Sequence, residues 1–449
     1  MRTYKNRGKE ELSPRKVFLL ILTFLTFVVC PVRATSEYYI IDIRTLGEDP
    51  ESKAFGINDR GQVVGYSGMV QGPEEGRRAF IWDSTNGIRS LGTLGGNHSE
   101  AYGINNAGQV VGRSTLLGRE GDVRGFIWEN GSMSDLGTLE GGWTEAHEIN
   151  NSREVVGYSV LSSSVTAFLW KNGSMSNLES LIGNSHGYAI NDAGQIVGYV
   201  NSVAFMWENG ITTLLGTLGG NRSYAWDINN NGQIVGSSGT GGYPSYFHAF
   251  FWENSTITDL GTLSGNWSEA YSINDTGQIV GQSAGHAFLW ENDTMTDLNE
   301  FLPIGSEWLL LEATAINNKG QIVGCGYISG KLHAFLMTPL IYADMDIKPN
   351  ALNLENKGRW VTCEISIPED FNVANVNSAS VRLQGEIQPD WIWFHENQNV
   401  LMAKFNRSVL QEVLEPGEVE LTVRGSFENG TYFQGSDTIK VIDKGHKEK

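Results

Sequence analysis

The feature that most constrains the fold of this chain is a short motif that occurs seven times. Each copy contains the pair IN followed closely by VG, as in AYGINNAGQVVGRS over residues 101–114. The copies begin at Ile57, Ile104, Ile149, Ile190, Ile228, Ile273 and Ile316, at intervals of 38 to 47 residues. Intervals of this size are typical of β-propeller blades and of helical solenoid repeats. The residue types within each repeat have to decide between these two architectures.

Each repeat consists of short runs of β-branched and aromatic residues bounded by Asn, Asp and Gly. Such runs are typical of strands joined by hairpin turns and leave no room for a long helix. Four runs per repeat predict a four-stranded antiparallel sheet, which is one propeller blade. Within the motif we expect the Asn side chain to cap the turn and Gly108 to take a positive φ, while Ile104 and Val110 pack between sheets. The Phe and Trp of runs such as GFIW are expected in the core.

The order of the runs predicts how the repeats close. The fourth run follows the motif in six repeats, but the last repeat ends at its third run, HAFLM. The missing copy stands before the first motif, at Tyr39–Gly47. We therefore predict a seven-bladed β-propeller over residues 38–341, closed by an N-terminal strand that leaves no free sheet edge.

A second domain is expected over residues 342–443. The repeat stops after Pro339, and about seven short strands follow, as in an immunoglobulin-like β-sandwich. A helical turn is expected from Ser408. The sequence DIKP followed by NLENKG resembles a small β domain appended to many exported prokaryotic, often archaeal, proteins, and the resemblance implies an accessory or attachment role. Residues 444–449 form a charged tail.

Residues 1–34 have the pattern of a secretory signal peptide. A basic stretch precedes an apolar run from Val17 to Val29, and Val32 and Ala34 fit the cleavage rule, although an uncleaved anchor stays an alternative. No other segment is apolar enough to span a membrane. Sequons for N-glycosylation agree with export. They begin at Asn97, Asn130, Asn150, Asn172, Asn221, Asn254, Asn266, Asn274, Asn292, Asn406 and Asn429. We expect an extracellular or cell-surface protein.

Charge and cysteine content narrow the choice of partner. The chain has 51 acidic and 32 basic residues and a formal net charge of −19, which disfavours nucleic acid and suits cations, basic partners or neutral sugars. Beyond the signal segment only Cys325 and Cys363 occur. Because they fall in different predicted domains, we expect two buried thiols rather than a disulfide or a metal pair.

The repeats resemble the family known as probable extracellular repeat, HAF type. The family's HAF triplet stands here at His248, His286 and His333, and the resemblance covers residues 38 to 341. It implies export and a repeat architecture, but no activity. The chain departs from its own pattern at Arg153, where the turn glycine is missing, and at Met337, where Trp is missing.

Candidate binding residues lie on loops at one rim of the predicted propeller, since the sheets themselves form the core. A recurring pattern, as in GGNHSEAY, places four glutamates near the channel entrance: Glu100, Glu145, Glu269 and Glu312. Aromatic residues follow along the same strands, among them Tyr102, Trp226 and Tyr271. Such a set could bind a sugar or a cation. Alternatively, the glutamates cap turns and the aromatic residues pack between blades. Glycans at Asn97, Asn221 and Asn266 would crowd this rim.

The sequence predicts a binding function more than a catalytic one. It contains no nucleophile elbow, zinc-binding HExxH, P-loop or EF-hand loop. We expect no catalytic residue, cofactor or metal, and a glycan or surface protein as partner. A polysaccharide hydrolase or lyase that uses two rim glutamates is one alternative. A passive structural component of the cell envelope is another.

Overall fold

The computed structural model describes residues 38–443, except 69–75, 141, 163, 179–180, 182, 243–245, 304, 356–357 and 429, and except the side chains of 119–121. The expected signal peptide and charged tail lie outside the described residues. The part that is described consists mainly of β-strands, which confirms the all-β class. None of its helices is long and apolar enough to cross a membrane.

Six four-stranded antiparallel sheets follow one another along the repeats. In each, chain order equals spatial order, because hairpin turns join consecutive strands. The strands of the first three sheets are β2 (Ser52–Ile57), β3 (Val63–Ser67), β4 (Arg78–Asp83), β5 (Gly87–Gly92); β6 (Gly95–Ile104), β7 (Val110–Leu116), β8 (Arg119–Glu129), β9 (Ser132–Asp135); and β10 (Trp143–Ile149), β11 (Val155–Val160), β12 (Val165–Lys171), β13 (Ser174–Asn177). Those of the next three are β14 (Ser185–Ile190), β15 (Ile196–Val200), β16 (Val203–Glu208), β17 (Ile211–Leu214); β18 (Gly219–Ile228), β19 (Ile234–Thr240), β20 (Phe247–Glu253), β21 (Thr256–Asp259); and β22 (Ser268–Ile273), β23 (Ile279–Ser283), β24 (His286–Glu291), β25 (Thr294–Asp297).

The last repeat takes its fourth strand from the start of the chain. After a short 3-10 helix, η1 (Leu298–Phe301), come β26 (Leu309–Ile316), β27 (Ile322–Ile328) and β28 (Lys331–Tyr342). Strand β1 (Tyr38–Asp42) pairs antiparallel with β28, with Tyr38 opposite Pro339 and Asp42 opposite Phe335. The predicted pairing of the N-terminal strand with the HAFLM strand is therefore present.

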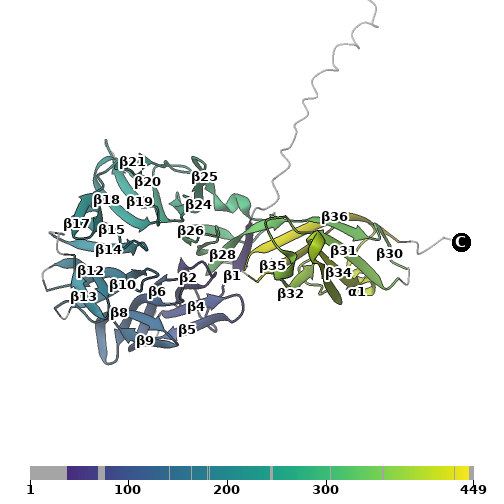
Figure 1. Ribbon diagram of the computed structural model, residues 1–449, viewed down its shortest axis with the longest axis horizontal. Helices are drawn as coiled ribbons and strands as arrows, with labels where there is room; N and C mark the ends of the chain where they lie inside the picture. The colour runs from purple at the N-terminus through teal and green to yellow at the C-terminus, as the bar shows by residue number, and fades with distance from the viewer. Residues whose placement is uncertain are drawn as a thin grey trace, which may run out of the picture. The chain divides into compact units, whose positions relative to one another are not determined.

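The core lies between neighbouring sheets rather than within any one of them. One cluster combines Val64 and Ala79 of the first sheet with Ala101, Ile104 and Val110 of the second. Another joins the first repeat to the last. It contains Ala54, Val63, Phe80, Val323 and Leu336. The sheets thus follow one another around a common centre and return to their starting point (Figure 1).

The turn of the repeat has the conformation expected from its sequence. Gly108 has φ 82°, and the side-chain oxygen of Asn105 accepts hydrogen bonds from the N–H groups of Ala107 and Gln109. Arg153, which replaces the turn glycine, also takes a positive φ of 63°. The expected core role of the aromatic run is confirmed for Phe126, which is fully buried, whereas Trp128 is partly buried and packs against the same cluster.

Two further sheets share one core in the C-terminal region. The first has the order β29 (Asp344–Lys348), β31 (Trp360–Ser366), β34 (Val400–Asn406), β33 (Trp391–His395). The second contains β32 (Val376–Leu383), β35 (Gly417–Phe427) and β36 (Tyr432–Ile442), with β30 (Ala351–Asn353) and the last residues of β28 each parallel to β36. Short helices connect them: η2 (Val373–Asn375), η3 (Glu396–Gln398) and α1 (Arg407–Val413). The helical turn expected from Ser408 corresponds to α1.

Candidate functional site

The first strand of each repeat pairs on only one edge within its sheet, and these strands surround a central channel. A cavity of about 480 Å³ occupies one end of this channel. Its wall contains one ring side chain from each of six repeats, in the order Phe55, Tyr102, His147, Tyr188, Trp226 and Tyr271. We call this space the aromatic cavity. Thr314 stands at the equivalent place in the last repeat.

Five of these rings form a continuous belt along the wall. Tyr102 contacts Phe55 and His147 at centroid distances of 5.3 and 5.1 Å. Tyr188 contacts His147 and Trp226, both at 4.7 Å. Edge-to-face and stacked pairs at such distances are favourable, so neighbouring rings hold one another in place. The predicted aromatic residues therefore line a cavity and also pack against the adjacent repeat.

Two carboxyl groups that the sequence analysis did not single out lie at the floor of this cavity. Glu148 and Asp227 directly precede the IN pair in their repeats, where the other repeats have Gly, Ala or Ser. The Ile149 N–H donates to Glu148 Oε1 at 3.0 Å. Asp227 accepts bonds from the N–H groups of Ile228 and Ile273 and from the Ser272 hydroxyl. Burial raises the pKa of Glu148 from 4.5 to about 8 and also raises the pKa of Asp227.

Two of the four predicted rim glutamates belong to a chain of ion pairs. Glu100 Oε1 lies 2.7 Å from Arg77 Nη1, and its Oε2 lies 3.0 Å from Arg113 Nη2. Arg113 also reaches Glu145, with Nη1 2.6 Å from Oε1. Burial alone would raise the pKa of Glu100, but a hydrogen bond from His98 and the charges of Arg113 and Arg77 hold it well below its usual range. Both glutamates are buried, so neither faces solvent.

The other two predicted glutamates have different surroundings. Glu312 lines the aromatic cavity, where Lys53 Nζ lies 2.5 Å from its Oε1 and the thiol of Cys325 donates to the same oxygen. Burial raises the pKa of Glu269, although hydrogen bonds from Tyr271 and Ser237 oppose the shift. The structure thus brings Glu312, Tyr102, Trp226 and Tyr271 to one cavity and keeps Glu100 and Glu145 in the surrounding wall.

Several buried polar atoms of the wall lack a hydrogen-bond partner among the described residues. They include Nε2 of His147 and Nε1 of Trp226, two residues that line the cavity, and Nδ1 of His186, which lies outside its lining. Burial lowers the pKa of His147 to about 3 and that of His186 to about 4, so both imidazoles are neutral at pH 7. Buried polar groups are normally satisfied, and unsatisfied atoms beside a cavity can bond a ligand.

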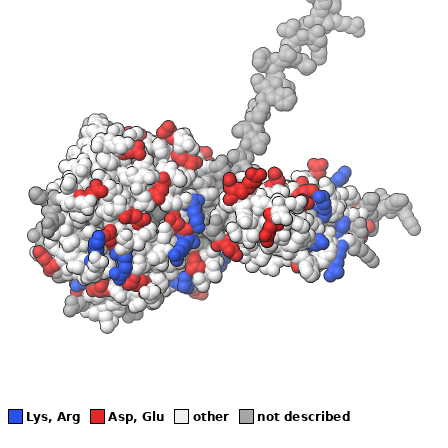
Figure 2. Space-filling model, in the orientation of Figure 1, with Lys and Arg blue, Asp and Glu red and all other residues white. Residues whose placement is uncertain are grey.

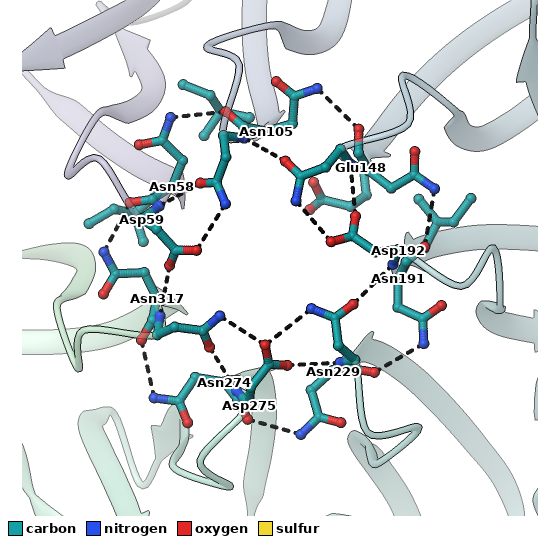
Figure 3. Close-up of a pocket in the computed structure, with 18 of the residues that line it drawn as sticks. Asn58, Asp59, Asn105, Glu148, Asn191, Asp192, Asn229, Asn274, Asp275 and Asn317 are labelled. Atoms are coloured by element: carbon teal, nitrogen blue, oxygen red, sulfur yellow. Dashed lines mark hydrogen bonds between the residues drawn. The ribbon is translucent and has the colours of Figure 1, made fainter.

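A ring of asparagines surrounds the other end of the channel (Figure 3). Each side chain donates from Nδ2 to the backbone oxygen of the equivalent asparagine in the next repeat, at 2.9 to 3.1 Å. The members of this asparagine ring are Asn58, Asn105, Asn150, Asn191, Asn229, Asn274 and Asn317. The last bond runs from Asn317 back to Asn58 O, so the ring is complete. A second circle of bonds links the residues that follow, from Asp59 to Asn318 and back.

Two of the predicted glycosylation sites, Asn150 and Asn274, are wrong because both residues belong to the buried asparagine ring. Asn150 and Asn274 are only 4% and 3% exposed, and each Nδ2, the atom that a glycan would occupy, donates two hydrogen bonds. Neither can carry a glycan in the folded protein. Asn429 lies outside the described residues, Asn97 is half-buried on β6, and Asn406 caps α1. The exposed sequon asparagines are Asn130, Asn172, Asn221, Asn254, Asn266 and Asn292.

The HAF histidines and the cysteines have structural surroundings. Each of the three histidines bonds an aspartate of the neighbouring strand, as His333 Nδ1 does with Asp42 at 3.0 Å. In the described part of the chain no group of three or more His, Cys, Asp or Glu could hold a metal ion. Cys325 and Cys363 are both buried and unpaired, as expected, and burial raises the pKa of each thiol.

Comparisons with known proteins identify similar solved structures at low identity. No protein-family model matches the chain, and neither does any curated protein. The β-propeller domain of the Trilobed protease from Pyrococcus furiosus is 11% identical, with 65% of this chain and 94% of that one covered, at a TM-score of 0.46. An acylaminoacyl peptidase from Pyrococcus horikoshii is 10% identical (74% and 60% covered, TM-score 0.44). The extracellular domain of a protein described as a hybrid two-component system of B. thetaiotaomicron is 12% identical (91% and 57% covered, TM-score 0.40). The resemblance to HAF-type repeats stays a prediction.

Proposed function

We propose that residues 38–341 form a seven-bladed β-propeller of HAF-type repeats and that residues 342–443 form an immunoglobulin-like sandwich. The proposal is supported by the complete asparagine ring, which has one member in each repeat, and by the pairing of β1 with β28. The sandwich serves as a spacer or attachment module in this proposal.

We further propose that the protein is exported and binds a glycan, without chemical conversion, in the aromatic cavity. The observation that carries this proposal is the continuous belt of rings with the unpartnered Nε2 of His147 and Nε1 of Trp226. Sugar rings present C–H faces that pack on aromatic side chains and hydroxyls that bond to polar atoms. A volume of about 480 Å³ is in the range of small-molecule sites. The signal-like segment 1–34 and the exposed sequons support export, and a surface protein is the other partner to test.

The test is a glycan-array measurement with the full-length protein, made without glycosylation so that Asn221 and Asn266 are bare. Trp226→Ala should abolish binding, and Trp226→Phe should weaken it because the ring is kept and the N–H is lost. The matched control is Trp391→Ala, since Trp391 is 63% exposed on β33. Thermal denaturation of each variant checks the fold. Absence of binding to any glycan would contradict the proposal and favour a protein partner or a passive envelope role.

A hydrolase or lyase is the second candidate, and the observation that favours it is that burial raises the pKa of Glu269, which is the direction that a general acid requires. Glu100 does not suit that role because its paired carboxylate stays ionised. Product analysis of bound glycans with wild type and Glu269→Gln decides the matter. Turnover that the variant loses would replace the binding proposal with an enzymatic one.

A further inference from the structure

The charge of the repeats is unevenly distributed around the channel. Arg222 is the only Lys or Arg between Lys171 and Lys319, although this stretch contains many acidic residues. On the face in Figure 2, basic side chains likewise gather over part of the repeats, and much of the remaining surface shows acidic or uncharged residues. Among the residues that line the aromatic cavity the one Lys or Arg is Lys53, and it is already paired with Glu312. The cavity therefore favours a positively charged ligand.

The floor of the cavity offers two carboxyl groups without a cation. Among the described residues, neither Glu148 nor Asp227 forms an ion pair, and Glu148 Oε2 accepts no hydrogen bond. The equivalent residues of the other repeats that line the cavity are small: Gly56, Ala189, Ser272 and Ala315. Gly103, the fifth, packs directly against Glu148, and a Cβ there would lie 2.8 Å from Glu148 Oε1. Burial and the charge of Asp227 raise the pKa of Glu148, and no positive charge opposes the shift. An ammonium group in this space would supply the missing counter-charge.

The wall above the floor suits the rest of such a ligand. Aromatic faces attract cations, so the belt from Phe55 to Trp226 supports an ammonium group as well as a sugar ring. Among the described residues the Nε1–H group of Trp226 has no hydrogen-bond partner, and Nε2 of the neutral His147 imidazole lies 3.7 Å from Glu145 Oε2, beyond hydrogen-bond distance. Each of these two groups can bond a hydroxyl. A ligand that meets all of these groups carries both an amine and hydroxyls.

Building on the proposed glycan-binding function, we infer that the ligand is an amino sugar whose free ammonium group binds between Glu148 and Asp227 at the floor of the aromatic cavity. Its hydroxyls bond to Trp226 and His147. An N-acetylated sugar fills the same space but leaves both carboxyls without a counter-charge. The chemistry thus distinguishes a free amine from an acetamide.

The test is isothermal titration of the full-length protein with a glucosamine oligosaccharide and with its fully N-acetylated counterpart. The free amine should bind at least about tenfold more tightly, and Glu148→Gln should weaken that binding by about 10- to 100-fold while leaving the N-acetylated ligand unaffected. The matched control is Glu418→Gln, an exposed residue of β35. The comparison of the two ligands on the wild type needs no variant and stands even if Glu148→Gln does not fold.

Each contrary result has a separate meaning. Equal affinity for the two oligosaccharides, or an unchanged ratio in Glu148→Gln, would overturn the amino-sugar inference and leave the glycan-binding proposal intact. Tighter binding of a lysine-containing peptide than of the glucosamine oligosaccharide would also overturn it. Failure of every glycan to bind would overturn the proposed function itself.

Discussion

The two ends of the central channel are built from the same seven strands, yet they differ in how far the repeat is preserved. At one end the asparagine ring has the same residue in every repeat. At the other end, only a few residues away along each strand, the wall changes from Phe to Tyr, His, Trp and Thr. The asparagine ring satisfies its own hydrogen bonds, whereas the aromatic cavity leaves polar atoms without partners. Exact repetition accompanies a complete circle of hydrogen bonds, and variation accompanies the cavity in which we propose that a ligand binds.

The largest loss of stability is expected from a substitution that opens the asparagine ring. Asn105→Ala removes four hydrogen bonds, to Gln109, Ala107 and the backbone oxygen of Asn150, from a buried site. We expect the free energy of unfolding to fall by about 3 kcal/mol in urea denaturation. The control Asn177→Ala, on an exposed strand residue, should change it by less than about 0.5 kcal/mol. Equal losses in the two variants would show that the ring has no special structural role.

A smaller loss of stability is expected from a substitution in the wall of the aromatic cavity. Arg113→Met leaves Glu100 and Glu145 without their shared cation, which should cost about 2 kcal/mol at pH 7. Because the pKa of Glu100 is lowered in the fold, its contribution is present above its usual pKa and is lost as the pH falls. The difference from wild type should therefore shrink in acid. Arg89→Met, which breaks an exposed pair with Asp83, is the control and should cost less than about 1 kcal/mol.

The contribution of the cavity floor to stability should depend on pH in the opposite sense. The pKa of Glu148 rises from 4.5 to about 8 on folding, so its protonated form favours the fold below 4.5 and this benefit is lost as the pH rises through 8. At pH 9 the free energy of unfolding of Glu148→Gln should consequently exceed that of wild type by at least about 1 kcal/mol, and the variant should melt at a higher temperature. At pH 4 the two proteins should melt at the same temperature. Thermal melts of Glu418→Gln at the same pH values provide the reference. A wild type as stable at pH 9 as the Glu148→Gln variant would contradict the buried, unpaired carboxyl.

The smallest effect is expected where the repeat itself departs from its pattern. Arg153→Gly restores the turn glycine and relieves a positive φ of 63°. The same change removes the ion pair with Glu129 at 2.7 Å and the contact with the Trp170 ring. Since these effects oppose one another, stability should change by no more than about 0.5 kcal/mol. A loss of several times that size would mean that Arg153 stabilises the turn far more than an exposed pair usually does.

Much of the fold follows from the repeat, because hairpin turns and strand runs are local properties of the sequence. The turn at Gly108, the capping role of Asn105 and the pairing of β1 with β28 were all predictable. The bond from each asparagine to the next repeat was not, because it depends on the separation of the sheets. The same dependence explains why the sequons at Asn150 and Asn274 could not be recognised as buried.

The candidate site was predicted only in part, and the reason is a β-bulge. Strict alternation along a strand places consecutive residues on opposite faces. In β10 the register shifts between Ala146 and Glu148, so His147 and Glu148 both line the channel. The shift between Ala225 and Asp227 does the same for Trp226 and Asp227. The predicted site residues included the rim glutamates but neither of the two carboxyls at the floor, because nothing in the sequence marks the position of the bulge.

The pairing of β1 with β28 has a mechanical consequence. The two strands are antiparallel, and Tyr38 at the start of β1 lies opposite Pro339 near the end of β28. A tension that drew the chain apart at these two residues would load the ladder at one end only. Its hydrogen bonds would then break in succession, as in a zipper, instead of resisting together as they do under shear. The closure can therefore yield to a modest pull in this direction.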